Sequence, residues 1–389
     1  MLLPVLLSVP IAFAIAWPLT AWLVRAGTHL GTLDTAGAAG HEKRVLRAVP
    51  NIGGVAIYAA VAIPLLAGVI ALATVPATIW ERWLPGIVPH LDRLDETLPT
   101  AIALLVGMTT LHIMGLADDR RPLSPWFKLA IQITVATGLV IGFDVRLLTL
   151  LGPVPSILIT IGWIVVITNA INFLDNMDGL AGGVSAIAAL LLLIATIVNT
   201  QWFIAGTLGL LAGALAGFLV FNYPPARIFM GDGGSLVVGF LLAVLTARTT
   251  FYNPADGDLG SAWYGVFMPL VVLAVPLYDF TTVTLLRLRQ GRSPFVGDQQ
   301  HLSHRLVRRR MSQRGAVVVI WGLTAVTGIG GISLGSLAWW QAILVGAQTL
   351  LVLMVVAMYE HASRHAVGDA ADETPHEAER EVVVEEDHA

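Results

Sequence analysis

The sequence predicts an all-α, polytopic integral membrane protein with about eleven transmembrane helices, and three observations lead to that prediction. The 389 residues are 56% hydrophobic and only 12% charged, whereas an average soluble domain has roughly 25% charged residues. The mean hydropathy is +0.78. Several long stretches carry no charge, and a membrane-spanning helix needs about 20 mostly apolar residues. These observations exclude an ordinary cytosolic enzyme, a disordered chain and a nucleic-acid-binding protein.

Each predicted span follows from an uncharged stretch. Residues 1–24 have no charged segment before them and are too long for the apolar part of a signal peptide, so we expect a retained helix. The run 179–226 is long enough for two spans and breaks at residues 199–202, and the run 315–359 breaks near Gly335. The expected helices cover residues 3–24, 53–75, 99–117, 127–143, 154–173, 180–198, 203–221, 234–249, 263–286, 315–334 and 338–358.

The distribution of Lys and Arg predicts the orientation, because these residues are enriched in cytoplasmic loops. Of the 22 Lys and Arg residues, 18 follow the odd-numbered spans, so we place those loops in the cytoplasm and the N-terminus outside. Residues 1–358 are expected to form the membrane domain with cytoplasmic loops. Residues 359–389 are expected to form an acidic, disordered cytoplasmic tail. The chain has no Cys, which excludes disulfides and thiol nucleophiles.

The polar clusters fall on the predicted cytoplasmic side. A transporter would place such groups near the bilayer midplane, whereas a position at the interface suits a soluble charged substrate that meets a lipid head group. The adjacent acids Asp118 and Asp119 close the third expected span. A hard divalent ion favours carboxylate oxygens, and Mg²⁺ uses one or two of them together with substrate phosphates. The alternative is a solvated loop in which these acids pair with Arg120 and Arg121.

Four polar side chains close the fifth expected span. Asn169 and Asn172 are three residues apart and share a helix face, and Asp175 and Asp178 repeat that spacing. Such groups are costly at a membrane unless they bind something. Helix capping by the Asn residues and Gly179 is the alternative, and a calcium EF-hand fits poorly because the acids stand at loop positions 1 and 4.

A loop rich in Pro and Gly, from Asn222 to Ser235, follows the seventh expected span. Its glycines let the backbone approach a ligand, and their amides can bind an anion at the start of the next helix. Asp232, which stands among these glycines, suits a metal, and Phe229 is a candidate to stack on a base. A tight turn with Asp232 as the helix N-cap is the alternative.

Basic side chains lie in the same set of loops. The loop after the ninth expected span contains Asp298, His301, His304 and Arg305. His and Arg side chains bind diphosphate oxygens, while a structural His pair and an Arg run that anchors the loop at the membrane are the alternatives.

Two further segments on this side are basic. Lys128 can meet a phosphate or snorkel to extend its own span. Lys43 and Arg44 form part of a basic patch that would attract a phosphate or lipid head groups.

In this order, the motifs resemble the polyprenyl-phosphate N-acetylhexosamine-1-phosphate transferases, the WecA/MraY-type membrane enzymes of glycosyltransferase family 4. The resemblance covers about residues 41–306 and includes the Pro50–Gly54 segment and Lys128 with Gln132, besides the acidic and histidine motifs. It implies that a UDP-N-acetylhexosamine and polyprenyl phosphate, such as undecaprenyl phosphate, give a polyprenyl-diphospho-sugar and UMP. It also implies Mg²⁺, with Mn²⁺ as an alternative, and a multi-pass protein of the bacterial inner membrane with its active site in the cytoplasm. A homodimer is a further expectation from the resemblance.

The resemblance assigns a role to each motif. Asp232 would be the principal metal ligand, and Asp118 and Asp119 would assist it or act as a base. The expected catalytic residues are Asp118, Asp119, Asp175, Asp178, His301, His304 and Arg305; the expected substrate-binding residues are Lys43, Arg44, Lys128, Asn169, Asn172, Asn222, Phe229 and Asp298; and the expected metal ligands are Asp232, Asp118 and Asp119.

The loop before His301 and the eleventh expected helix resemble the branch that transfers N-acetylglucosamine-1-phosphate. Two departures concern single positions: Ser303 stands where the peptidoglycan branch of the family often has a third His, and Asn176 replaces a common Gly. The alternative within the family is the phospho-MurNAc-pentapeptide transferase. A transporter of lipid-linked sugars, for which Asp279 is the candidate acid inside a span, and an inactive scaffold with a partner-recruiting tail are the alternatives from other classes.

Overall fold

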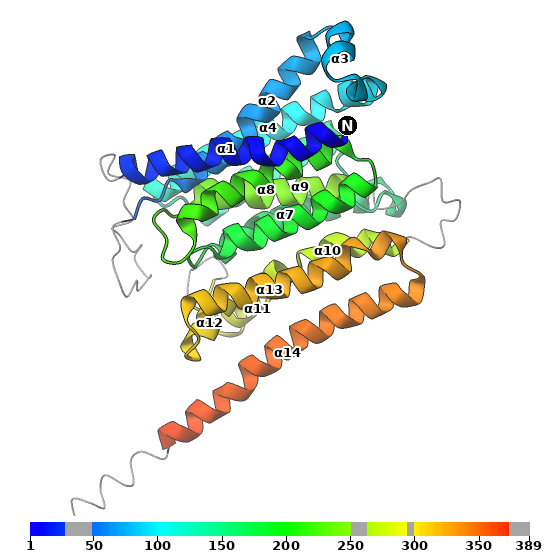
Figure 1. Cartoon of the computed structure of the whole chain (residues 1–389). Helices are drawn as coiled ribbons and strands as arrows, with labels where there is room; N and C mark the ends of the chain where they lie inside the picture. Colours follow the sequence, from blue (N-terminus) through cyan, green and yellow to red (C-terminus); the bar gives the residue numbers. More distant parts are fainter. Residues whose placement is uncertain (28–48, 250–262, 294–298, 373–389) are drawn as a thin grey trace, which may run out of the picture.

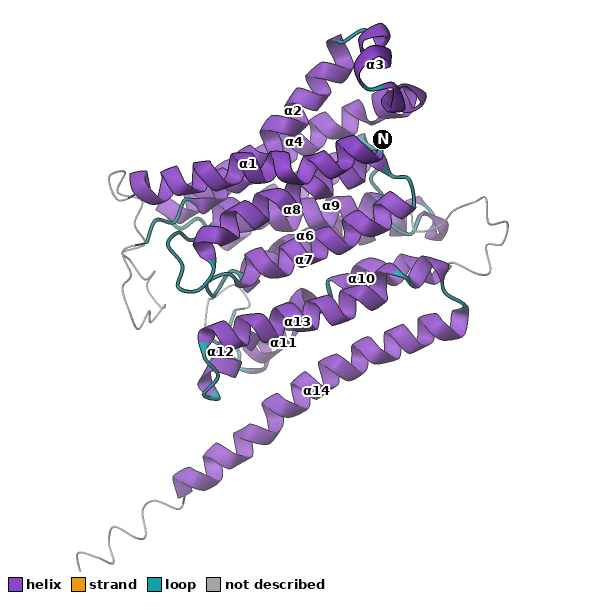
Figure 2. Cartoon of the chain, viewed as in Figure 1, coloured by secondary structure: helices purple, strands orange, loops and turns teal. Residues whose placement is uncertain are grey.

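The computed structural model describes residues 1–27, 49–249, 263–293 and 299–372, and these residues form a bundle of helices without a β-strand (Figure 1, Figure 2). Backbone N–H and C=O groups find no water inside a bilayer, so a spanning segment satisfies them within its own helix. The predicted all-α class is confirmed.

The long helices supply the body of the bundle and the short ones its connections. The long helices are α1 (Leu2–Gly27), α2 (Gly53–Thr74), α4 (Leu91–Arg120), α5 (Pro125–Gly142), α6 (Pro153–Leu174), α7 (Leu180–Val198), α8 (Trp202–Asn222), α9 (Asp232–Arg248), α11 (Ala274–Arg289), α13 (Gln313–Ile332) and α14 (Trp339–Asp372). The short elements are α3 (Ala77–Trp83), η1 (Pro85–His90), η2 (Thr149–Leu151), η4 (Trp263–Phe267), α10 (Met268–Val272), α12 (Leu302–Arg308) and η5 (Leu334–Ser336).

The helix lengths support a multi-pass membrane protein. Within the described ranges, nine helices are long and apolar enough to cross a membrane, and the bent pair α10–α11 makes ten if it counts as one span. The remaining expected span corresponds to α9, which has 17 residues and is buried along nearly all of its length. A helix this short lies inside the bundle, where its neighbours rather than lipid cover it.

The predicted helix over residues 263–286 is wrong in one respect, because it is broken. Its two parts, α10 and α11, meet at Leu273 with a bend of 64°. Pro276 accounts for the break, since it has no N–H to donate to the carbonyl of Val272 four residues earlier.

Other helix ends also differ from expectation. Helix α4 begins at Leu91 rather than at residue 99, and it is preceded by the short elements α3 and η1. Helix α14 continues beyond residue 358 to Asp372, so the first part of the expected tail is helical. Figure 1 shows α14 along the outside of the bundle.

Small residues allow close packing at the centre of the bundle. Gly209, Gly213 and Gly217 form a stripe with four-residue spacing along α8, and a Cβ on any of them would overlap atoms of α1. Small residues are favoured where membrane helices approach closely, because van der Waals contact is then greatest. The tight packing of α1 against α8 fixes the end of α8, where Asn222 lies.

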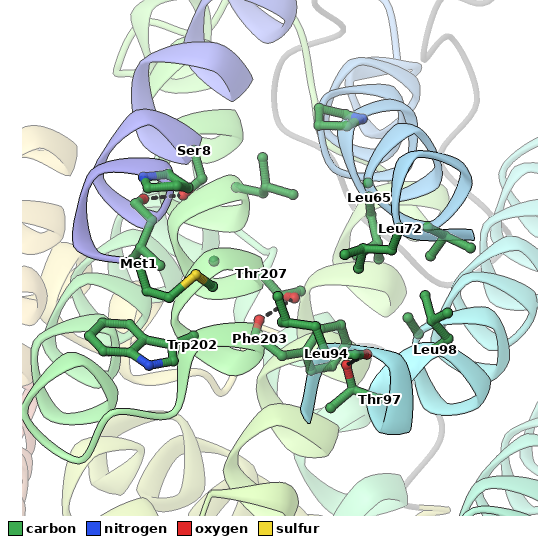
Figure 3. A pocket seen from close by; sticks show the side chains of 18 of the residues that line it. Met1, Ser8, Leu65, Leu72, Leu94, Thr97, Leu98, Trp202, Phe203 and Thr207 are labelled. Atoms are coloured by element: carbon green, nitrogen blue, oxygen red, sulfur yellow. Dashed lines mark hydrogen bonds between the residues drawn. The ribbon is translucent and has the colours of Figure 1, made fainter. Parts of the chain in front are cut away.

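A cavity of about 320 Å³ lies between the starts of α1, α4 and α8 and the end of α2 (Figure 3). Its lining includes Leu65, Leu72, Leu98 and Phe203, and none of the side chains that line it is ionisable. The polar motifs lie at the other ends of these helices. The cavity therefore lacks the groups that phosphate chemistry requires.

Candidate active site

Acids from separate parts of the chain meet at one end of the bundle. Asp118 lies in the last turn of α4, and Asp232 is the first residue of α9. The ammonium of Lys128, on α5, lies 2.7 Å from Oδ2 of Asp118 and 3.4 Å from Oδ2 of Asp232. Because one cation contacts both carboxylates, the predicted convergence of these two acids is present in the structure.

Asp232 is held in place by the predicted Asn pair on α6. The Nδ2 group of Asn172 lies 2.9 Å from Oδ1 of Asp232 and 2.9 Å from Oγ of Ser235. One turn earlier, Nδ2 of Asn169 donates to Oε1 of Gln132 at 2.5 Å. Both Asn side chains therefore face the junction of α5, α6 and α9, as their spacing along one helix face predicts.

Asp119 has a different environment from Asp118. Its Oδ1 accepts the backbone N–H of Asp232 at 2.9 Å, and its Oδ2 accepts the N–H of Gly233 at 3.1 Å. Nδ2 of Asn51 also donates to Oδ1, at 3.1 Å. The first N–H groups of a helix have no partner within the helix, and a carboxylate stabilises that positive end. Asp119 therefore acts as an external cap for α9, and its oxygens are already engaged.

Helix α4 contacts the first turn of α9 closely. A Cβ on Gly115 would overlap the carbonyl of Asp232, so only glycine permits this approach. Nδ1 of His112 lies 2.7 Å from the carbonyl oxygen of Gly233 and must be the donor, since a carbonyl only accepts. These contacts fix the backbone at Asp232.

Asp175 and Asp178 lie in the turn between α6 and α7. Burial, together with the nearby carboxylates of Asp232, Asp119 and Asp178, raises the pKa of Asp175 to about 8. The turn therefore lies close to the carboxylates of Asp119 and Asp232. Asp178 accepts the N–H of Ala226 at 2.9 Å and so stabilises the loop between α8 and α9.

Asn222 also stabilises that loop. Its Oδ1 accepts the N–H of Gly179 at 3.0 Å, and its Nδ2 donates to the carbonyl of Ile228 at 2.8 Å. The side chain is buried, with 3% exposed. Phe229, the expected partner of a base, is partly exposed, and its backbone is bonded to Pro50 and Gly53. Asn222 thus shapes the loop that carries Phe229.

The histidine segment contacts Asp279, a residue that the sequence did not identify as part of the site. Nδ1 of His301 lies 2.8 Å from Oδ2 of Asp279, and Oδ1 of Asp279 accepts the N–H of Leu302 at 2.7 Å. Asp279 is fully buried on α11. The ring of Phe173, next to Asn172, meets that of His301 edge-on at 6.0 Å. His301 therefore lies beside the end of α6, and His304 lies one turn further along α12 at a ring distance of 6.5 Å.

Arg305 has partners other than the expected phosphate or sugar. Its Nε lies 2.7 Å from Oε1 of Glu360 on α14, and its Nη1 donates to the carbonyl of Gln300 at 2.5 Å. Its Nη2 lies 3.4 Å from Oγ1 of Thr282. The guanidinium is buried and joins α12 to α11 and α14.

Three of the expected substrate-binding residues, Lys43, Arg44 and Asp298, lie outside the described residues.

The oxygen donors at this site fit a magnesium ion. Asp118 and Asp232 provide two carboxylates beside the ammonium group of Lys128. Mg²⁺ is usually bound by one or two carboxylates, with phosphate and water completing its shell. Among the described residues, no group of three or more His, Asp and Glu has the spacing of a complete metal site. At such a site a phosphate substrate would supply part of the coordination of the ion.

Similarity to known proteins places the chain in a family. The sequence model of glycosyl transferase family 4 matches residues 101–250. The chain is 30% identical to the probable undecaprenyl-phosphate N-acetylglucosaminyl 1-phosphate transferase of Bacillus subtilis, over 79% of this chain and 80% of that protein. The chain belongs to glycosyl transferase family 4.

Two further relatives of this family 4 chain differ in the transferred group that their names give. It is 32% identical to the decaprenyl-phosphate N-acetylglucosaminephosphotransferase of Mycobacterium leprae, over 73% of each protein. It is 27% identical to the phospho-N-acetylmuramoyl-pentapeptide-transferase of Levilactobacillus brevis, over 75% of this chain and 85% of that protein. The expected family is thus confirmed, and the N-acetylglucosamine branch is the more similar of the two.

The part of the chain that matches the family model includes the acids and Lys128 but not α11 or α12. Asp279, which the sequence did not assign to the site, lies on α11 beyond the residues that match the family model. Its signal in the sequence is a lone acid within an apolar stretch, a pattern that also fits a transporter. Its partner His301 is 22 residues away, so the pairing appears only in the folded chain.

Proposed function

We propose that this protein transfers N-acetylglucosamine-1-phosphate from UDP-N-acetylglucosamine to polyprenyl phosphate and releases UMP. Its family membership and the names of the relatives from Bacillus subtilis and Mycobacterium leprae support the reaction class. The single observation that carries the proposal is the contact of Lys128 with both Asp118 and Asp232 at the ends of their helices. The excess of Lys and Arg on this side supports a cytoplasmic site at the bacterial inner membrane.

In this reaction a phosphate oxygen of the lipid attacks the β-phosphorus of the nucleotide sugar. The new P–O bond forms as the bond from that phosphorus to the bridging oxygen breaks, and UMP leaves with the electron pair. The lipid phosphate is largely ionised at pH 7, because its second pKa is about 6. No protein base is then required, and the main tasks are neutralisation of charge and in-line positioning.

The residues of the chain divide these tasks. Lys128 provides a positive charge beside the reacting phosphates, and Asn172 fixes the orientation of Asp232. Asp119 and His112 hold the start of α9 in place. A bound Mg²⁺, held by Asp232 and Asp118, would neutralise charge that develops on the phosphate oxygens. The partly exposed ring of Phe229 is available to stack on uracil.

The test is a panel of donors with the purified, detergent-solubilised protein. UDP-N-acetylglucosamine, UDP-N-acetylgalactosamine, a UDP-bacillosamine-type sugar and UDP-MurNAc-pentapeptide would each be supplied with undecaprenyl phosphate, and UMP would be measured. We expect UMP from the first donor, only when lipid phosphate is present and only with Mg²⁺ or Mn²⁺. Turnover of UDP-MurNAc-pentapeptide alone would assign the protein to the other branch. No UMP from any donor would overturn the proposal.

The role of Asp232 is tested separately. Asp232→Asn keeps the size of the side chain but removes its charge, so we expect kcat to fall by about 10²–10³ while the protein stays folded. The matched control is Asp92→Asn, an exposed acid in the first turn of α4 at the other end of the bundle, which should keep full turnover. Undiminished turnover of Asp232→Asn would remove this residue from the proposed metal site.

A further inference from the structure

His301 and the short helix α12 that follows it contact three different parts of the bundle. The contacts are made by every second residue, at positions 301, 303 and 305. His301 contacts Asp279 on α11, and Arg305 contacts Glu360 on α14. Between them, Ser303 contacts Asn176 in the turn between α6 and α7. The contact of Ser303 is the one of these three that reaches the turn carrying Asp175 and Asp178.

The Asn176–Ser303 contact has a defined geometry. Oγ of Ser303 donates to Oδ1 of Asn176 at 2.5 Å, and Ser303 is 1% exposed. The orientation of the Asn176 amide follows from its second bond, in which Nδ2 donates to the carbonyl of Phe173 at 2.7 Å. With its amino group on that carbonyl, Asn176 presents an acceptor to Ser303.

We propose that Asn176 and Ser303 are a pair of positioning residues, which hold the helix bearing His304 against the turn bearing Asp175 and Asp178. The inference rests on the proposed phosphosugar transfer. The two side chains are in direct contact, and each supplies the hydrogen-bond partner that the other requires.

The position of the pair explains why it matters for the reaction. Asn176 lies between the two acids of the turn, so a shift of its backbone moves both of them. Ser303 lies between the two histidines. A displacement of about 1 Å between groups that act on one substrate costs about 10²-fold in rate when they are otherwise well placed. A buried hydrogen bond between the two segments resists such a displacement.

The first experiment is a double-mutant cycle with Asn176→Ala, Ser303→Ala and the combined variant. We expect each single variant to lower kcat about tenfold and to change KM for UDP-N-acetylglucosamine by less than about twofold. The combined variant should also lose about tenfold, because the second change removes a group whose partner is already absent. A loss near a hundredfold would mean that the two residues act independently and would overturn the proposal.

A second comparison isolates the hydroxyl group. Ser303→Thr and Ser303→Val have side chains of nearly the same shape, but only Thr can donate to Asn176. We expect Thr to restore kcat to within about threefold of the wild type and Val to stay about tenfold lower. Equal kcat values for the two variants would contradict the proposal even if Ser303→Ala fails to fold.

Matched controls come from the other end of the bundle. Asn199 donates its Nδ2 to Ala195 in its own helix, and Ser333 donates its hydroxyl to Ile329. Asn199→Ala and Ser333→Ala should leave kcat within about twofold of the wild type. If they lower kcat as much as the Asn176 and Ser303 variants do, the effect is one of general stability.

A measurement without turnover separates this proposal from the proposed function. Amide hydrogen exchange in residues 302–308 should be about tenfold faster in Asn176→Ala and Ser303→Ala than in the wild type, with exchange in α8 unchanged. Unchanged exchange in α12 would overturn the pairing. An inactive wild-type protein that still gives the expected exchange would overturn the proposed function alone.

Discussion

Oδ1 of Asp119 accepts the backbone N–H of Asp232 at 2.9 Å, although the two residues are 113 positions apart. The neighbouring carboxylate of Asp118 instead contacts Lys128. The two adjacent acids thus have separate tasks. Asp119 stabilises the N-terminal end of α9, whereas Asp118 lies beside the ammonium group of Lys128. Substitutions at the two positions should therefore have different effects.

Asp119→Ala should lower the stability of the folded protein. The change leaves the N–H groups of Asp232 and Gly233 without their acceptor, at a cost of about 1–3 kcal/mol in the free energy of unfolding. Asp119→Asn keeps one acceptor oxygen and should lose less. Thermal unfolding in detergent measures both variants. A wild-type melting temperature for Asp119→Ala would contradict its role as a cap.

Asp118→Asn should lower turnover rather than the stability of the folded protein. It removes a charge beside Lys128 and the proposed metal site, so we expect kcat to fall by about 10²-fold or more while the melting temperature stays near that of the wild type. Turnover in the presence of excess Mg²⁺ is the measurement. If kcat is retained and the protein is destabilised, Asp118 serves the fold rather than the reaction.

The sequence was sufficient to predict that these acids converge, but not how they divide the work. Spans of known length and a charge count place Asp118 and Asp232 at the same membrane surface. Adjacent residues on a helix nevertheless point about 100° apart. Which of the two acids meets Lys128 depends on how α9 packs against Gly115, and that is a tertiary contact.

The remaining differences have similar causes. Pro276 was visible in the sequence and marks the break at Leu273, so this bend was predictable from the missing N–H. The family resemblance implied that Asn222 binds substrate. In the structure its amide bonds to two backbone groups, which depends on a loop conformation that spacing does not reveal.

Asp279→Asn should impair catalysis more than folding. An amide can still accept the N–H of Leu302 through its oxygen, but its Nδ2 would then face His301 as a donor. That change places the proton of a neutral imidazole on Nε2, so the ring would present a different group to substrate. We expect kcat to fall about 10–100-fold. The melting temperature of Asp279→Asn should exceed that of Asp279→Ala, and equal kcat for wild type and Asp279→Asn would remove this role.

The buried pair of Arg305 and Glu360 can be assigned to the fold or to the reaction by a double substitution. Removing one partner of a buried ion pair costs about 3–5 kcal/mol, because the other charge is left unpaired. Arg305→Met and Glu360→Leu should therefore each lower the melting temperature. Combined, they replace the pair by apolar groups and should recover most of that loss.

Turnover of the combined variant gives the assignment. If Arg305 serves to join α12 to α14, as its contacts with Glu360 and Gln300 indicate, the combined variant should regain most of its kcat. A stable combined variant without turnover would instead show that the guanidinium acts on substrate.

Asp175 should make the metal-free protein less stable as the pH rises. Its pKa in the folded protein is about 8, above the usual value of 3.8. Between these values the folded state holds a proton that the unfolded state has released, so the free energy of unfolding falls with increasing pH. Asp175→Asn is uncharged throughout this range and should show a smaller fall in melting temperature between about pH 5.5 and about pH 8.5. The matched control, Asp92→Asn, replaces an exposed acid and should follow the wild type. Parallel curves for wild type and Asp175→Asn would mean that Asp175 is ionised in the folded protein at neutral pH.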